Sequence, residues 1–426
     1  MSSSDRAMDN KTKGAWIIHH GKKIAGASNA SADYSTVDIA SKSGALLARM
    51  AGTNQLELNA ELVRTLAKAG GLSPKTDLPA CLDQLASIKV IDRAADGSVS
   101  VIGISASSAL DHTASLFDRN DPEPHEIASL ALGELVSKSP LDRKIASELI
   151  GDEHRLTSSQ TTELIDQATS LGFVEADGDV ANPLLFNGNL FRRDTVAKTK
   201  KVLDSLAPAE QSAFIELEES LRKSGALTIS QVEKLLGAAL LNKLRAAGVF
   251  DENIVSNEMG DHSFVTLPGA FHKFTNPLVD DAFDHAKALV AALSYGMHVS
   301  ASTRGSIWGV DLLLKKLLRG EAVGPAPAIG KDYRALELER VVQIEQVGTR
   351  YRMRLLKREV GEIALQVLQT GGATASSVTL SIPGAQVTGY TGPEKARTDF
   401  RKKKELQPTR SQMQGLLSSV RSGGGL

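Results

Sequence analysis

Hydrophobic residues recur along this chain first at helical spacing and then in short alternating runs. Within residues 62–104, apolar side chains stand three or four positions apart, at Leu78, Leu82, Leu85 and Ile88. Residues at that spacing share one face of an α-helix, so the segment predicts an amphipathic helix. Two β-favouring runs follow, and the Asp96-Gly97 pair between them predicts a β-hairpin.

The same order of helix and hairpin recurs in residues 156–186 and 221–267. The second instance has an apolar helical stripe followed by a turn at Asp177-Gly178. The third has a leucine-rich helix and a hairpin that closes at residues 264–267. A generic helical protein with hairpins would mimic one such unit, but three in succession are harder to obtain by chance.

A fourth, more irregular unit is expected between residues 278 and 370. Its hairpin spans residues 340–356 and is followed by a closing helix at residues 359–368. Residues 320–330 contain two prolines and three glycines, a composition that predicts a loop.

A helix, a short turn, a second helix and a β-hairpin form the element order of the winged-helix superfamily. Through segments such as residues 164–186 and 240–267, the chain resembles that superfamily over roughly half to two thirds of its length. The resemblance is a pattern of elements rather than a signature motif. It implies an α+β fold, mainly helical, in which tandem winged-helix-like domains with short β-hairpins bind DNA or dock on other proteins.

These patterns divide the chain into six parts. They are an N-terminal arm with a short strand (1–35), unit 1 (36–105), the acidic unit 2 (106–190), unit 3 (191–270), the irregular unit 4 with a basic hairpin (271–370) and a flexible basic tail (371–426). The short strand is expected around Trp16 to Ile18, with His19 and His20 beyond it as a solvated pair. The Gly- and Ser-rich composition of the last part favours flexibility.

The overall composition is typical of a globular intracellular protein. Of 426 residues, 42% are hydrophobic and 23% charged, which suits roughly two to four domains. The single cysteine, Cys81, excludes an internal disulfide. Residues 1–14 lack the apolar stretch of a secretory signal, and no run approaches the length of a membrane span. We therefore expect a cytoplasmic protein with no membrane partner.

The net charge of −1 hides a gradient along the chain. Residues 105–190 contain 15 acidic and 5 basic side chains (net −10), whereas residues 340–426 contain 6 acidic and 14 basic ones (net +8). Clustered basic residues bind polyanions, so the basic end suits double-stranded DNA. The acidic unit 106–190 is expected to bind a protein partner or to mediate homo-oligomerisation. Alternatively, the two ends attract each other, within one chain or between subunits.

Arginines alternate with apolar residues in the second strand of the fourth hairpin. Arg350, Arg352 and Arg354 interleave with Tyr351, Met353 and Leu355. Alternate residues of a strand share one face, so the three guanidinium groups line one side while the apolar set packs inward. Such a face can lie along a phosphate backbone or enter a minor groove. Alternatively it is solvated, with Glu345 facing Arg350 across the turn.

Further basic residues extend the candidate DNA-binding set. They are Lys234, Lys243 and Arg245 in unit 3, Lys357 and Arg358 directly after the hairpin, and Lys402, Lys403 and Lys404 in the tail. The helices that precede the hairpins of units 1 and 2 carry at least as many acidic as basic side chains, and phosphates repel the acidic ones. Units 3 and 4 are therefore the expected DNA-binding units.

No arrangement of residues predicts an enzyme or a cofactor site. The loop before Lys331 has the wrong glycine spacing for a phosphate-binding loop, and its prolines remove backbone donors. Asp280, Asp281, Asp284 and His285 could ligate a metal, but the first turn of a helix favours aspartates for electrostatic reasons alone. We expect no cofactor, no metal and no catalytic activity.

Together these patterns favour a DNA-associated tandem winged-helix protein, such as a transcriptional regulator, that contacts the phosphate backbone through residues 340–358. The alternative is a protein–protein adaptor or scaffold subunit of a larger assembly, for example one in chromosome maintenance or defence. A DNA binder loses affinity steeply with added salt, whereas an adaptor is indifferent to changes in the basic hairpin.

Overall fold

The described part of the chain folds into helices and small antiparallel sheets. The computed structural model describes residues 8–25, 30–53, 55, 57–104, 108–274, 280–300 and 303–372. Within them the fold is α+β and mainly helical, as the sequence predicts. The predicted basic tail beyond Gly372 lies outside the described residues.

One sheet topology recurs four times among the described residues. In each sheet a short first strand pairs antiparallel with the second strand of a hairpin, which therefore lies in the centre. The strand orders are β1-β3-β2, β4-β6-β5, β7-β9-β8 and β10-β12-β11. The sequence predicts the hairpins, but first strands of two to four residues are too short to leave a pattern of their own.

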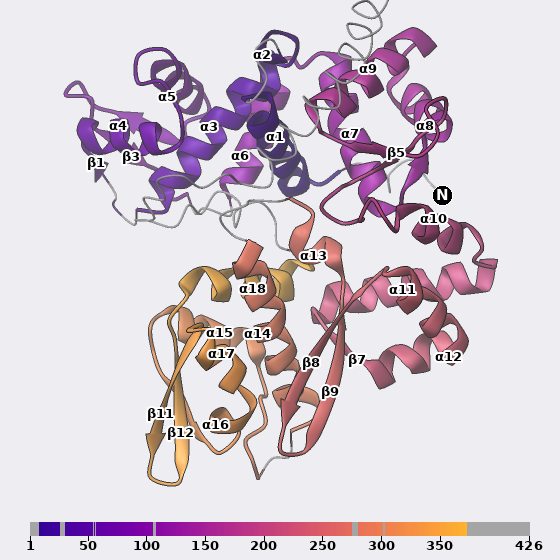
Figure 1. Ribbon diagram of the computed structural model, residues 1–426. Coiled ribbons are helices and arrows are strands. Elements are labelled where there is room, and N and C mark those ends of the chain that lie inside the picture. The colour runs from indigo at the N-terminus through magenta and orange to yellow at the C-terminus, as the bar shows by residue number, and fades with distance from the viewer. Residues whose placement is uncertain are drawn as a thin grey trace, which may run out of the picture.

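Units 1 and 2 surround their sheets with helices (Figure 1). Unit 1 contains α3 (Ser35–Ala51), β1 (Glu57–Leu58), α4 (Ala60–Ala69), α5 (Asp77–Ser87), β2 (Ile91–Arg93) and β3 (Val99–Val101), with α2 (Ala30–Asp33) before it and α6 (Ala109–Arg119) after it. Unit 2 contains α7 (Pro124–Lys138), β4 (Leu141–Asp142), α8 (Arg143–His154), α9 (Ser158–Leu171), β5 (Glu175–Asp177) and β6 (Leu184–Phe186). In both units two helices separate the first strand from the hairpin.

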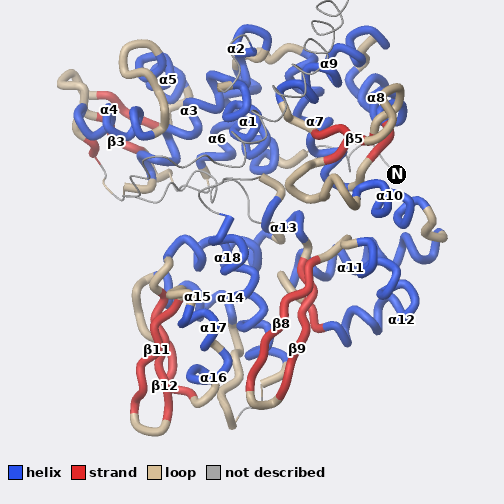
Figure 2. Tube along the Cα trace, in the orientation of Figure 1, coloured by secondary structure: helices blue, strands red, loops and turns tan. Residues whose placement is uncertain are grey.

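Units 3 and 4 carry the two longest hairpins, which Figure 2 shows as extended strand pairs. Unit 3 contains α10 (Val196–Asp204), α11 (Pro208–Ser224), β7 (Leu227–Thr228), α12 (Ile229–Ala247), β8 (Asp251–Asn257), β9 (Gly260–Thr266) and α13 (Pro268–His272). Unit 4 contains α14 (Asp280–His298), α15 (Val310–Leu318), β10 (Val323–Ala326), α16 (Ile329–Asp332), α17 (Arg334–Leu338), β11 (Val342–Val347), β12 (Arg350–Leu355) and α18 (Arg358–Thr370). The loop expected at residues 320–330 thus contains β10 and the start of α16, because Val323 and Ile329 are buried in the core.

Helices α9 and α12 begin with the same local signal. Thr157 and Thr228 cap these helices, and Gln160 and Gln231, three residues later, bond back to the backbone of each cap. This reciprocal arrangement satisfies backbone N–H groups that have no partner within the helix. In α12 the backbone leaves helical geometry at Gly237 (φ 74°, ψ 157°), so two helical segments also separate β7 from the third hairpin.

Residues 10–24 form a buried helix, so the prediction of a short strand around Trp16 to Ile18 is wrong. Helix α1 (Asn10–Ile24) packs against α3, α6 and α7, and Trp16, Ile17 and Ile18 are fully buried. A helix that is covered on nearly all sides has no polar stripe, so its apolar run imitates a strand.

The His19-His20 pair lies inside the protein rather than in solvent as expected. His19 is 4% exposed and His20 0%. The His20 ring stacks on Phe173 with 3.8 Å between ring centroids, and its Nε2 lies 3.2 Å from the Ser129 carbonyl oxygen. Burial lowers the pKa of His20 to about 3, so the imidazole is neutral at physiological pH.

Figure 1 shows α13 at the junction of the two halves of the molecule, and Phe274, two residues after this helix, connects them. It packs in the hydrophobic core of units 1 and 2, with its ring centroid 4.8 Å from that of Trp16. Beside it, Lys273 Nζ forms an ion pair of 2.5 Å with Glu134, which also accepts a hydrogen bond of 2.8 Å from Trp16 Nε1. Burial opposes ionisation of Glu134, but the charge of Lys273 and these hydrogen bonds together hold its pKa below the usual value.

We expect Glu134→Gln to lower the free energy of unfolding by about 1.5–3 kcal/mol at pH 7, because Lys273 loses a charge-assisted partner. The folded-state pKa of Glu134 is depressed below its ordinary value of 4.5. Its contribution is therefore present above pH 4.5 and is lost as the pH falls through the folded-state pKa. Urea denaturation of the wild type and the variant should give a stability difference that shrinks below pH 4.5. A difference that is constant across pH would contradict this account.

Candidate nucleic-acid interface

The β11–β12 hairpin presents three arginines on one face. Arg350, Arg352 and Arg354 are exposed, whereas Met353 is buried and Tyr351 is partly buried on the opposite face. The alternation predicted from the sequence is confirmed at these positions. Met353 packs in the core of unit 4, and because side chains alternate along a strand this packing decides which face meets solvent. We call the outer side of the three arginines the arginine face.

The side chains of the neighbouring strand β11 neutralise little of the positive charge on the arginine face. The register pairs Gln343 with Arg354, Glu345 with Arg352 and Val347 with Arg350. Glu345 thus stands opposite the middle arginine and not opposite Arg350 as expected, because the turn contains only Gly348 and Thr349. In the described part of the chain, none of the three arginines forms an ion pair with a carboxylate.

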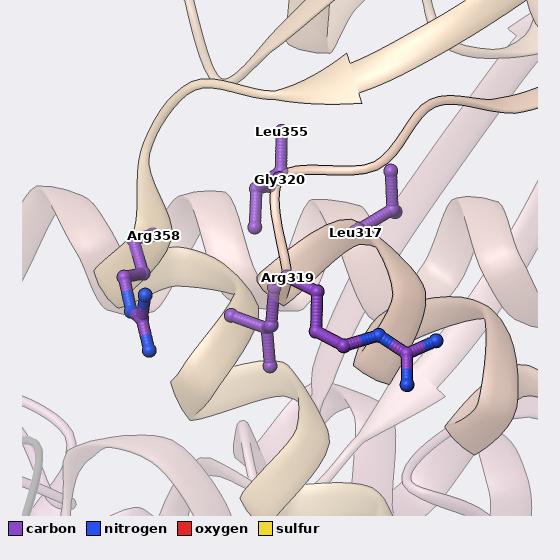
Figure 3. A pocket seen from close by; sticks show the side chains of 6 residues that line it. Leu317, Arg319, Gly320, Leu355 and Arg358 are labelled. Carbon is purple, nitrogen blue, oxygen red and sulfur yellow. The ribbon is translucent and has the colours of Figure 1, made fainter.

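The exposed surface continues from the third arginine across a hollow between β12, α15 and α18 (Figure 3). Arg354 Nη1 donates a hydrogen bond of 3.2 Å to the carbonyl oxygen of Gly320, at the edge of this hollow. The hollow has a volume of about 420 Å³ and is lined by Leu317, Leu318, Arg319, Gly320, Leu355 and Arg358. Figure 3 shows Arg319 and Arg358 on two sides of it.

The two predicted basic residues after the hairpin lie in different surroundings. The Arg358 side chain is 66% exposed and forms an ion pair of 2.8 Å with Glu362, one helical turn further on. Lys357 is partly buried, and its Nζ lies 3.5 Å from His285 Nδ1. Arg358 therefore belongs to the surface beside the arginine face, whereas Lys357 is partly covered by α14.

Helix α15 adds basic residues that no sequence pattern predicts for the interface. Lys315, Lys316 and Arg319 are exposed on this helix and directly after its end. Lys315 pairs with Asp311 at 3.5 Å and Arg319 with Glu321 at 2.9 Å. Lys315 and Arg319 are four residues apart, which indicates a shared helix face. Only the fold places α15 beside β12.

The basic residues predicted in unit 3 are not joined to the arginine face. Arg245 forms an ion pair of 2.6 Å with Glu252, and Lys243 one of 3.4 Å with Glu210. Lys234 is exposed. All three lie on α12, which Figure 1 places well apart from the β11–β12 hairpin. The remaining candidates, Lys402, Lys403 and Lys404, lie outside the described residues.

The β8–β9 hairpin packs against unit 4 through apolar side chains. Val255 of β8 and Phe264 of β9 belong to the same hydrophobic core as Phe283, Val290 and Leu293 of α14. Both hairpin strands lie against α14. Separating this hairpin from unit 4 would expose these side chains to water, which disfavours the open arrangement.

Polar contacts fasten the tip of the same hairpin. The Asp332 carboxylate, which is 7% exposed, accepts hydrogen bonds of 3.0 Å from both Asn257 and Arg304. Glu258 pairs with Arg304 at 3.0 Å and with Lys331 at 2.8 Å. The third hairpin is therefore fastened to unit 4 along one face, while Glu258, Met259, Gly260 and Asp261 at its tip remain exposed.

Replacement of Asp332 by alanine should loosen this hairpin. Arg304 and Asn257 would lose their shared buried acceptor, so we expect the free energy of unfolding to fall by about 1–3 kcal/mol. Amide hydrogens of residues 256–262 should exchange faster with solvent, as measured by hydrogen–deuterium exchange. The control Glu321→Ala removes an exposed ion pair and should change stability by less than about 1 kcal/mol. Unchanged exchange at the hairpin tip in Asp332→Ala would show that Asp332 does not hold it.

Within the described ranges, no group of three or more His, Cys, Asp or Glu side chains is arranged to hold a metal ion. None of the helices in that part of the chain combines the length and the apolar character that crossing a bilayer requires. No family model matches the chain, and comparison with curated proteins and with solved structures finds no match either. We therefore infer function from the geometry of the hairpin.

Proposed function

We propose that this chain is a DNA-associated protein of four winged-helix-like units that binds double-stranded DNA through the arginine face of β11–β12. The observation that carries the proposal is the row of three exposed arginines, none of which forms an ion pair with a carboxylate among the described residues. The fourfold recurrence of short strand, helical segments and hairpin supports the winged-helix-like assignment.

The spacing of the arginine face suits a DNA backbone. Alternate residues of a β-strand are about 6.6 Å apart, and a DNA strand advances about 3.4 Å along its axis for each phosphate. Because the backbone winds around the axis, neighbouring phosphates are further apart in space than this axial rise. A strand that follows the backbone can therefore offer its guanidinium groups to neighbouring phosphates. The planar guanidinium donates two parallel hydrogen bonds to a phosphate, so each contact is both charged and oriented.

Charge reversal of the arginine face tests this proposal. We expect Arg350→Glu, Arg352→Glu and Arg354→Glu combined to weaken binding to a duplex of random sequence by roughly 10³-fold, because three charge-assisted contacts of about 1.5 kcal/mol each are lost. Fluorescence anisotropy at low salt measures the change.

A matched variant controls for total charge. Arg64, Lys68 and Lys75 are exposed in unit 1, so their combined replacement by glutamate changes the net charge by the same amount away from the hairpin. This control should keep most of the affinity of the wild type. Equal losses in the two variants, or no binding of duplex DNA by the wild type at low salt, would disprove the proposal.

A second candidate function is that of an adaptor, and it is favoured by the outer face of α8. Ile145 and Leu149 are each 41% exposed and lie four residues apart, so they share a helix face. Exposed Glu148 and Asp152 flank them. Exposed Lys144 also flanks the pair, so its rim carries both signs of charge. We propose a second copy of this chain as the partner, because Lys144 of one copy then has carboxylates of the other as complements.

Sedimentation velocity tests the adaptor candidate. If α8 mediates self-association, the wild type should sediment as an oligomer at high concentration, and Ile145→Asp with Leu149→Asp should sediment as a monomer. Ile215→Asp, at an exposed aliphatic residue of α11, is the control and should leave the oligomer intact. A wild type that stays monomeric at all concentrations would exclude this candidate.

A further inference from the structure

The arginine face is one side of a larger basic surface. Arg354 reaches the edge of the hollow through its hydrogen bond to Gly320. Arg319, at the end of α15, and Arg358, at the start of α18, stand on two sides of that hollow (Figure 3). Lys316 is exposed on the last turn of α15. Lys316 lies three residues before Arg319 and so on a neighbouring part of the same helix face. We group the three strand arginines with these three residues and call the group the basic surface.

Acidic neighbours neutralise the basic surface only weakly. Arg319 pairs with Glu321 and Arg358 with Glu362, but the arginine side chains remain 67% and 66% exposed. Ion pairs in water contribute about 0–1 kcal/mol, so phosphates can replace these carboxylates at little cost. All six basic side chains are consequently accessible to a polyanion.

No described unit presents a helix suited to reading bases together with a free hairpin. In unit 4 the helix before the hairpin is α17, which has five residues and is thus about 7.5 Å long. In unit 3, Lys243 and Arg245 of the corresponding helix are already paired with carboxylates. In unit 2, the outer face of α9 carries Glu163 and Asp166.

Unit 1 is no better suited to base readout. Its helix α5 carries Asp77 and Asp83, which pair with Lys42 and Arg93. Sequence-specific recognition in the major groove requires an inserted element whose side chains reach base edges. The described units offer basic groups that reach phosphates, but no long, free helix with base-reading side chains beside them.

We propose that the basic surface clamps the phosphate backbone of duplex DNA without regard to base sequence. This inference rests on the proposed function and narrows it to sequence-independent binding, in place of the operator recognition that a transcriptional regulator needs. Arg350, Arg352 and Arg354 contact one stretch of backbone, and Lys316, Arg319 and Arg358 extend the contact past the hollow. Affinity comes from the release of counterions from phosphates, which is the same for every sequence.

Selection from a randomised duplex library tests sequence independence. The full chain is incubated at low salt with duplexes that carry a random central segment, and the bound fraction is recovered, amplified and sequenced over several rounds. We expect no enriched motif and dissociation constants that agree within about tenfold among individual duplexes. An enriched motif that binds more than tenfold tighter than the starting pool would overturn the inference while leaving DNA binding itself established.

The salt dependence of binding tests the extent of the surface. Six phosphate contacts predict a slope of about −5 in a plot of log affinity against log salt, or a loss of about 10³-fold between 50 and 200 mM salt. Lys316→Ala with Arg319→Ala should reduce the magnitude of the slope by about 2. Arg64→Ala with Lys68→Ala, at exposed residues of unit 1, should leave it unchanged. An equal slope in the wild type and the Lys316/Arg319 variant would remove α15 from the surface.

The outcomes separate this inference from the proposed function. Absence of binding to any duplex refutes the proposed function, and the inference falls with it. Binding that depends on the three strand arginines but selects a motif refutes the inference alone. Binding without a motif, with a slope that falls when Lys316 and Arg319 are replaced, supports both.

Discussion

The packing of the β8–β9 hairpin against α14 decides which surface of this protein remains free. Val255 and Phe264 enter the core of unit 4, and the buried Asp332 holds the hairpin tip through Asn257 and Arg304. Lys287 of α14, itself 7% exposed, adds an ion pair of 2.6 Å to Asp251 at the start of the hairpin. Apolar burial provides the driving force, and the polar contacts fix the orientation because a buried carboxylate is costly without partners.

The β8–β9 hairpin packs against unit 4, whereas the β11–β12 hairpin exposes its outer face to solvent. Its sheet has the same strand order as the other three, yet its outer face carries arginines that form no ion pair with a carboxylate among the described residues. One architecture thus serves two purposes in neighbouring units. In unit 3 the hairpin packs against α14 and so joins unit 3 to unit 4. In unit 4 the hairpin presents positive charge to solvent. The difference lies in the side chains on the outer face and in what packs against them.

Within the described residues, the structure separates the acidic unit 2 from the basic β11–β12 hairpin. Figure 1 places α8 and α9 of unit 2 at the opposite end of the molecule from the β11–β12 hairpin. Attraction between these two described surfaces within one chain would require a rearrangement of both halves. Phe274 in the core of units 1 and 2, together with the Lys273–Glu134 ion pair, opposes such a rearrangement. Among the described residues, the acidic unit 2 therefore leaves the arginine face exposed.

Hairpins and amphipathic helices were predictable from the sequence, because both leave a periodic signal. The alternation of Arg350 to Leu355 correctly predicts which side chains face solvent, since Met353 must be buried. Helix α1 was missed because it is surrounded by other helices, so that Trp16 and its neighbours show no amphipathic period. Strand β10 was missed because Gly324 and Pro325 favour a loop, whereas burial of Val323 and pairing with β12 favour a strand.

The sequence by itself determined the local elements, the gradient of charge and the side of β12 on which the arginines stand, because each depends on residues close together in the chain. The tertiary structure decided that Arg319 and Arg358 flank one hollow and that Lys243 and Arg245 each form an ion pair with a glutamate. It also decided that the β8–β9 hairpin packs against α14. These features join residues that are distant in sequence, and their pairing depends on packing energies that no local pattern contains.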